Sequence, residues 1–170
     1  MDKINVMINH KINVRRIIFF YLKHIYRLMK QQSFILDSEG RFKSRLLLDF
    51  NDKNYDVKKS QYKYCSIDFI VLNLDNLKSI YIEHKDKKIN AKNFQSFMIN
   101  KCKLDACKRY YKDTIFVWDC LDNVYWCYYS DELHQSRLEQ INNSDVYFID
   151  KNVVNCGFDN LIYSINEFLG

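Results

Sequence analysis

The sequence predicts an α/β fold in which helices alternate with groups of short strands. Residues 11–31 carry apolar side chains at the spacing of an amphipathic helix. Residues 66–73 and 79–85 are rich in the β-branched and aromatic side chains that favour strands, and so are residues 114–118 and 124–129. A helical segment is expected between the two pairs of strands. With a further strand expected at residues 45–50, before the first pair, the order of the core is α-β-β-β-α-β, followed by a C-terminal extension.

The first helix has a basic face opposite its apolar one. Arg16, Lys23, Arg27 and Lys30 recur at helical spacing on this face. A basic stripe of this kind could bind the phosphate backbone of a nucleic acid. It could equally be the solvated face of a helix in a basic protein, and the sequence leaves both interpretations open.

Residues 34–57 are expected to form two or three short strands. Residues 37–40 have the composition of a turn, and residues 45–50 are then the strand that borders the following hairpin.

The hairpin brings two acidic residues and a lysine together. If its turn is centred on Asp75 and Asn76, antiparallel register places Asp68 directly opposite Glu83, and Lys85 projects from the same face as Glu83. Two carboxylates in this arrangement repel each other and raise each other's pKa. A divalent cation of the magnesium type would remove the conflict, because it takes oxygen ligands from one or two carboxylates, water and a substrate phosphate. With a lysine beside it to orient or deprotonate water, the pattern predicts metal-assisted phosphodiester hydrolysis.

An ordinary hairpin with a solvated outer face is the alternative interpretation of the same residues. Asp68, Glu83 and Lys85 would then be surface residues without a joint role. Ile70 and Leu72 argue against this alternative, because the alternation of a strand places them on the same face.

The remaining elements complete the predicted order. After a polar loop at residues 87–93, a helix that begins at Asn90 or Asn93 is expected to run to Tyr110. Its expected buried residues are Phe94, Phe97, Met98 and Cys102. After the strands at residues 114–118 and 124–129, a short helix at 131–141, a strand at 146–149 and a closing helix at 158–169 are expected.

Length and composition limit the possible classes. The 170 residues predict a single domain, 1–170, with a core at about 11–130 and the extension at 131–170. The chain has no proline, three glycines and a net charge of +5, which is compatible with a polyanionic partner and suggests an AT-rich genome. Its six cysteines form no C-x-x-C pair, which argues against a structural zinc site. Neither a signal peptide nor a membrane span is visible, so an intracellular protein, cytoplasmic or organellar, is expected.

Asp68, followed after fourteen residues by Glu83-His84-Lys85, resembles the motif of the PD-(D/E)xK, or restriction-endonuclease-like, nuclease superfamily. The resemblance implies that Asp68 and Glu83 are metal ligands, that the main-chain carbonyl of His84 completes the metal shell, and that Lys85 is the catalytic lysine. Gln95 resembles the glutamine that some branches place on the next helix. The implied cofactor is Mg²⁺, with Mn²⁺ able to replace it, and the implied fold is the mixed sheet flanked by helices.

Two features depart from the pattern of the superfamily. Ile67 stands where the motif has proline, and residues 15–31 contain no acidic residue to match the one that the superfamily often places on the preceding helix. Glu39 is the nearest candidate for that acid.

The resemblance implies a metal-dependent endonuclease that hydrolyses phosphodiester bonds in double-stranded DNA. A homing or restriction type is favoured, with a Holliday-junction resolvase or a viral RNA endonuclease as the alternative. Such enzymes generally act as symmetric oligomers, so a homo-oligomer without membrane association is expected. Lys87 and Lys88 are further candidates for contact with the nucleic acid. A non-catalytic nucleic-acid-binding or interaction domain is the alternative from a different class.

Overall fold

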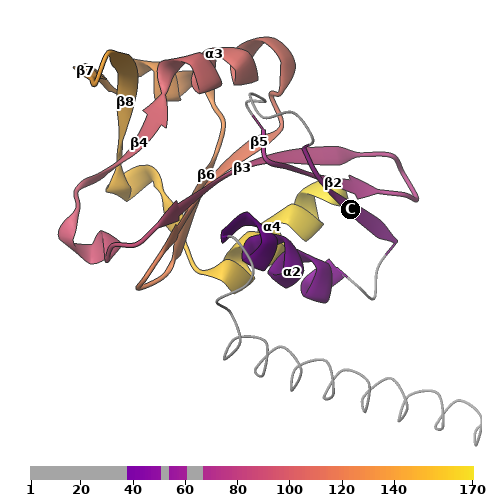
Figure 1. Cartoon of the computed structure of the whole chain (residues 1–170). Helices are drawn as coiled ribbons and strands as arrows, with labels where there is room; N and C mark the ends of the chain where they lie inside the picture. The colour runs from indigo at the N-terminus through magenta and orange to yellow at the C-terminus, as the bar shows by residue number, and fades with distance from the viewer. Residues whose placement is uncertain (1–37, 51–53, 61–66) are drawn as a thin grey trace, which may run out of the picture. The chain divides into compact units, whose positions relative to one another are not determined.

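The structure, a computed structural model, describes residues 38–50, 54–60 and 67–170. A mixed sheet of six strands lies at the centre of this part of the chain (Figure 1). Its strands lie side by side in the order β1 (Tyr55–Lys59), β2 (Phe69–Asn73), β3 (Ser79–Lys87), β5 (Thr114–Cys120), β6 (Val124–Tyr128) and β9 (Asn155–Cys156). β3 and β5 are parallel, and the other neighbouring strands are antiparallel. The predicted mixed sheet is therefore confirmed.

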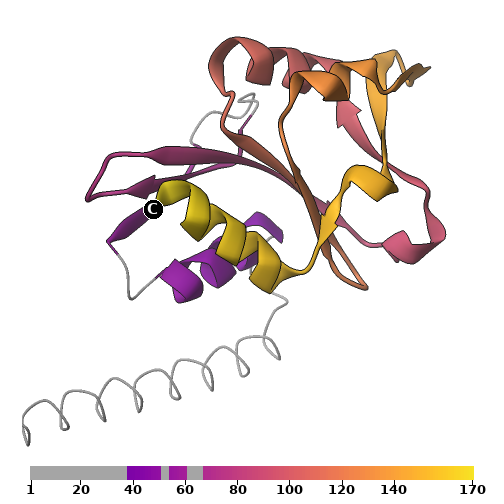
Figure 2. The ribbon, with the colours of Figure 1, turned by 180° about the vertical axis from the view of Figure 1, so that it is seen from behind.

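Two helices cover one face of this sheet. They are α2 (Ser38–Phe50) and α4 (Phe158–Leu169), and both views of the ribbon place them on the same side of the sheet (Figures 1 and 2). Their apolar side chains form one core with the side chains that alternate strand positions send to this face. The core residues of the two helices are Phe42, Leu46, Phe50, Leu161, Ile165 and Leu169.

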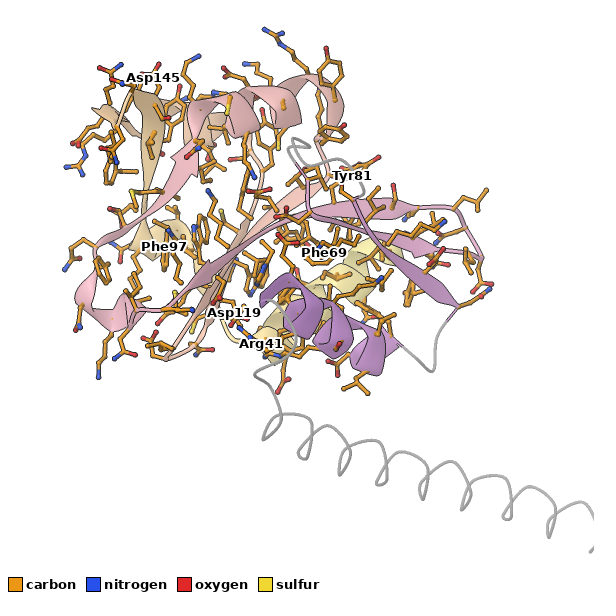
Figure 3. All side chains as sticks on the ribbon, viewed as in Figure 1. Arg41, Phe69, Tyr81, Phe97, Asp119 and Asp145 are labelled. Atoms are coloured by element: carbon orange, nitrogen blue, oxygen red, sulfur yellow. The ribbon has the colours of Figure 1, made fainter. Side chains whose placement is uncertain are left out.

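Helix α3 (Lys101–Tyr110) and a second sheet cover the opposite face. The second sheet has the order β4 (Ser96–Asn100), β8 (Ser144–Asp150) and β7 (Arg137–Ile141). Its buried residues Phe97 and Ile99 join Phe116 and Trp118 of the central sheet in a second core. In Figure 3, Phe97 lies beside β4, whereas Phe69, which belongs to the first core, lies beside α2. Three short 3₁₀ turns connect these elements: η1 (Ala91–Asn93), η2 (Asp131–Gln135) and η3 (Lys151–Val153).

The predicted register of the hairpin is confirmed. Phe69 pairs with Ile82, and the pairing continues without a shift to Leu72 and Ser79. The ladder ends at Phe69 and Ile82, and the N–H of Asp68, the residue before β2, donates to the carbonyl of Ile82, so the expected pair of Asp68 with Glu83 is not part of the ladder. The crossover from β3 through α3 makes β5 parallel to β3, as the predicted element order requires.

Helix α2 replaces the turn and the strand expected at residues 37–50. That prediction is wrong because Phe42, Leu46 and Phe50 recur every four residues, and this spacing aligns them on one helical face. Gly40 lies in the first turn of α2 and does not end it. Strand β1 begins at Tyr55, so a strand is present at the end of the segment, residues 34–57, that was expected to form strands.

Strand β4 replaces the first half of the helix expected at residues 90–110. Phe97 and Ile99 are buried while Met98 between them is exposed, which is the alternation of a strand. Of the expected core residues Phe94, Phe97, Met98 and Cys102, only Phe97 is buried. Helix α3 therefore begins at Lys101.

The expected helix at residues 131–141 is a 3₁₀ turn, η2, followed by strand β7. β7 pairs with β8 through a turn in which Asn142 and Asn143 both have positive φ, a conformation that asparagine tolerates well. The predicted strands at 114–118 and 124–129, the strand at 146–149 and the closing helix at 158–169 are confirmed as β5, β6, β8 and α4.

The predicted helix at residues 11–31 lies outside the described residues, together with Arg16, Lys23, Arg27 and Lys30. Ser38–Gly170 form one compact unit. The division into a core at 11–130 and an extension at 131–170 stays a prediction. Among the helices that the structure describes, none is both long and apolar enough to cross a membrane.

Candidate active site

Asp68 lies where β2 begins, and its carboxylate takes part in the pairing of the strands. Its main-chain N–H donates to the carbonyl of Ile82 at 2.9 Å, and its carbonyl accepts from the N–H of Ser60 at 2.7 Å. The N–H of His84 donates to Oδ2 of Asp68 at 2.7 Å. One carboxylate oxygen is thereby fixed against β3, beside Glu83.

Glu83 lies on β3 with only 2% of its surface exposed. Its side chain lies on the sheet face that α3 covers, the same face as Phe116, its partner in the ladder between β3 and β5. Oε1 of Glu83 accepts a hydrogen bond from the ammonium of Lys103 on α3. Oε2 is buried and has no hydrogen-bond partner among the described residues. Because a buried carboxylate oxygen without a partner is costly, this atom marks a place for a further donor or cation.

The surroundings of Glu83 raise its pKa from 4.5 to about 7. Burial is the largest cause, because it disfavours the charged form, and the nearby Asp68 carboxylate adds to it. The ammonium groups of Lys103 and Lys85 act in the opposite direction. In the absence of another cation, Glu83 therefore carries its proton up to nearly neutral pH.

Lys85 lies two residues after Glu83 on β3 and projects from the same face. Burial lowers the pKa of its ammonium, and the positive charges of Lys103 and Lys87 lower it further. Glu83 and Asp68 oppose this shift. A lysine with a lowered pKa holds its proton less firmly than a surface lysine does, which suits a group that takes a proton from water.

The imidazole of His84 lies on the opposite face of the sheet, away from these charges. Its ring stacks on Phe42 of α2 with the ring centroids 4.2 Å apart, and its Nε2 is 3.7 Å from Oδ2 of Asp119. The side chain is 1% exposed, and neither ring nitrogen has a hydrogen-bond partner among the described residues. Only the main chain of His84 therefore lies beside Asp68 and Glu83.

Lys103 is a site residue that the sequence interpretation missed. It belongs to α3, and its neighbours Leu104 and Cys107 are the residues of this helix that pack against the sheet. The sequence does show that Lys103 is next to the apolar positions of a helix, which indicates a lysine near the core. It does not show which strand residue Lys103 contacts, because that depends on how the helix packs on the sheet.

Gln95, expected on the helix after the hairpin, does not lie on α3. It is exposed between η1 and β4, and its carbonyl accepts a hydrogen bond from the N–H of Lys151. The residue of the helix that reaches Glu83 is Lys103.

The other candidates lie near the ends of the strands. Lys87 is half-buried at the end of β3, and Lys88 is exposed just beyond it. Glu39, in the first turn of α2, has its Oε2 2.5 Å from Nζ of Lys59 on β1.

Two carboxylates and one buried, unpartnered oxygen fit a hard divalent cation. In the part of the chain that the structure describes, no group of three or more His, Cys, Asp or Glu side chains is arranged to hold a metal. Asp68 and Glu83 would therefore need water, a main-chain carbonyl or a substrate phosphate to complete the shell. This is the sparse protein coordination typical of magnesium sites.

A solved structure of another protein shares this architecture. D212, a nuclease from a fusselovirus, matches with a TM-score of 0.50 and 12% sequence identity, over 79% of this chain and 96% of D212. The Holliday junction resolvase Hjc from the archaeal hyperthermophile Archaeoglobus fulgidus matches with a TM-score of 0.39 and 13% identity, over 65% of this chain and 88% of Hjc. No protein-family model and no curated protein matches the chain. The chain has a restriction-endonuclease-like fold.

Proposed function

We propose that this protein is a metal-dependent endonuclease that hydrolyses phosphodiester bonds in nucleic acid. One observation carries the proposal: the charges of Asp68 and Lys85 both act on Glu83, whose Oε2 is buried and lacks a partner among the described residues. A purely structural role would leave this arrangement costly, because like charges face each other in an apolar setting. The match to D212, a nuclease, supports the same class of activity.

Asp68 and Glu83 are the proposed metal ligands. Asp68 is held in place through its Oδ2, and Glu83 has an oxygen available to a cation. The main-chain carbonyl of His84 is the proposed third ligand from the protein. A Mg²⁺ ion bound here, or Mn²⁺ in its place, would polarise the phosphodiester and lower the pKa of a bound water.

Lys85 is the proposed partner of the attacking water. Its position two residues after Glu83 on β3 supports this role, because a phosphate held by a metal at Glu83 would lie close to it. Its lowered pKa makes it able to accept the proton of the water or to orient the water through its ammonium.

Double-stranded DNA is the proposed substrate, and a symmetric homo-oligomer of homing or restriction type is the proposed active form. The net charge of +5 supports a polyanionic substrate without distinguishing DNA from RNA. A four-way junction, RNA and binding without cleavage are the alternatives that the experiment below separates.

The test measures cleavage of supercoiled plasmid, linear duplex, a four-way junction and RNA by the full chain, with Mg²⁺ or with EDTA. Cleavage of at least one substrate with Mg²⁺ alone is expected. The Lys85→Ala variant should lose most of the cleavage rate in single-turnover experiments while it keeps metal-dependent binding, because Lys85 handles the nucleophile and does not hold the metal.

Lys78→Ala is the matched control, because Lys78 is exposed in the connection between β2 and β3, remote from Asp68. It should cleave like the wild type. Cleavage that persists in EDTA, or wild-type turnover in Lys85→Ala, would contradict the proposed mechanism. Binding without cleavage of any substrate would favour the non-catalytic alternative.

A further inference from the structure

We propose that Lys103 is a metal-gated phosphate contact: without metal its ammonium is hydrogen-bonded to Glu83, and when a divalent cation binds, the ammonium moves to the phosphate of the substrate. The inference rests on the proposed function. It adds a residue outside the Asp68, Glu83 and Lys85 pattern and assigns it two successive partners.

The first partner follows from direct contact. Nζ of Lys103 donates to Oε1 of Glu83, and Glu83 is the acid that contacts Lys103 among the described residues. The two side chains come from different layers of the fold, α3 and β3, and meet where the carboxylate is almost completely buried. A buried carboxylate needs a positive partner, and Lys103 supplies it.

The second partner follows from the balance of charge. When Asp68 and Glu83 are ionised and Lys85 and Lys103 are protonated, the four charges sum to zero. A divalent cation at the two carboxylates makes the site strongly positive and repels an ammonium that shares the same carboxylate. The cation also brings a substrate phosphate into its shell, so the nearest anion left for Lys103 is that phosphate.

Lys103 has the freedom to make this change. Its side chain is 25% exposed, whereas that of Glu83 is 2% exposed, so the lysine side chain has room to change its position while the carboxylate stays in place. A lysine has a compact charge on a flexible four-carbon stem, and it can move between partners without movement of the helix.

The same helix provides a matched control. Lys101, two residues earlier, pairs with Asp105 at 2.8 Å in a contact within α3. Lys101→Met removes one lysine from the same turn of the helix without touching Glu83.

The first measurement is the salt dependence of binding to a short fluorescent DNA duplex, in EDTA and with Ca²⁺ in place of Mg²⁺. Each phosphate contact contributes about 0.9 to the slope of log affinity against log salt. Lys103→Met should leave the slope in EDTA unchanged and flatten the slope in Ca²⁺ by about 0.9. Lys103→Arg, which keeps the charge, and Lys101→Met should match the wild type under both conditions.

The second measurement needs no nucleic acid. The ammonium groups of the full chain, labelled with ¹⁵N in lysine, are followed by NMR during a titration with Mg²⁺ alone. The signal that Lys103→Met removes should shift as the metal binds, while the signal of Lys101 stays in place.

An unchanged Lys103 signal at saturating Mg²⁺ would overturn the inference, because the ammonium would then remain on Glu83. Equal flattening of the slope in EDTA and in Ca²⁺ would also overturn it, since the phosphate contact would not depend on metal. Either result leaves metal-dependent cleavage by Asp68, Glu83 and Lys85 intact. Failure of the wild type to bind or cleave any nucleic acid would instead remove the proposed function, and the phosphate contact with it.

Discussion

The Glu83→Gln variant tests whether the carboxyl group of Glu83 is buried in an electrostatically unfavourable place. Glutamine has nearly the same shape as a protonated glutamate, so the variant mimics the low-pH form of the wild type at every pH. The pKa of Glu83 is about 7 in the folded chain and 4.5 in its unperturbed form. Between these two values the folded protein keeps a proton that the unfolded chain has lost.

The sign of the effect follows from proton linkage. Because the folded state binds more protons in this interval, the wild type loses stability as the pH rises from 4.5 through 7, and the loss is complete above 7. Each pH unit is worth about 1.4 kcal/mol for one proton, so the whole interval amounts to roughly 3 kcal/mol. For a chain of this size that is a difference of roughly 10 °C in Tm.

The assay is urea or thermal unfolding of both proteins in EDTA at a series of pH values from 4.5 to 9. The free energies of unfolding should be nearly equal at pH 4.5, and Glu83→Gln should become the more stable protein by roughly 3 kcal/mol at pH 8. Glu139→Gln, at an exposed position of β7, controls for the loss of one negative charge. A difference between wild type and Glu83→Gln that does not change with pH would refute the assigned burial of this carboxyl group.

Three further predictions concern the anchoring of the site, its flanking charges and the fold. Asp68→Ala should lose about 1 kcal/mol of stability in EDTA, because the N–H of His84 loses its acceptor at 2.7 Å. Asp68→Asn keeps an acceptor at this position and should be the more stable of the two variants. Equal unfolding curves for both variants would mean that this hydrogen bond contributes nothing. The double variant Lys87→Gln, Lys88→Gln should flatten the slope of log affinity for DNA against log salt by between about one and two. An unchanged slope in fluorescence titrations would place the phosphate contacts elsewhere. Phe42→Ala should cost about 3–5 kcal/mol in urea unfolding, because Phe42 is fully buried between α2 and the sheet; a cost well below about 1 kcal/mol would argue against the packing of α2.

The hairpin was predictable because its determinants are local. The strands around Asp68 and Glu83 have strong β propensity, and the short connection between them sets a register that keeps Phe69, Val71, Ile80 and Ile82 on one buried face. This register brings the end of β2 beside Glu83, whereas Asp68 itself lies beyond the ladder and is held by its hydrogen bonds to Ile82 and His84.

The errors arose where local composition and burial conflict. Turn-forming residues at the start of α2 suggested a loop, although the spacing of Phe42, Leu46 and Phe50 already indicated a helix. In β4, Phe97, Met98 and Ile99 fit either a strand or a helix in so short an apolar run, and only the pairing with β8 decides between them. Both errors concern segments whose structure depends on what covers the central sheet.

The partner of Glu83 depends on tertiary packing in the same way. Lys103 is twenty residues away in sequence and reaches Glu83 because α3 crosses the sheet face between β3 and β5. No period in the sequence relates a helix residue to the strand residue that it meets, so the contact follows only from the three-dimensional packing.

The placement of Glu83 separates the requirements of the fold from those of chemistry. Its ladder partner Phe116 and the neighbouring pair of Lys85 with Trp118 show that this face of the sheet is otherwise a site for large apolar side chains. A buried ion pair here gives little or no net stability, and apolar residues of similar volume often stabilise a protein more. The fold alone therefore gives no reason for a glutamate and two lysines beside its second core. A carboxyl group that is desolvated and raised in pKa is instead suited to release its proton when a divalent cation arrives, because the cation stabilises the charged form.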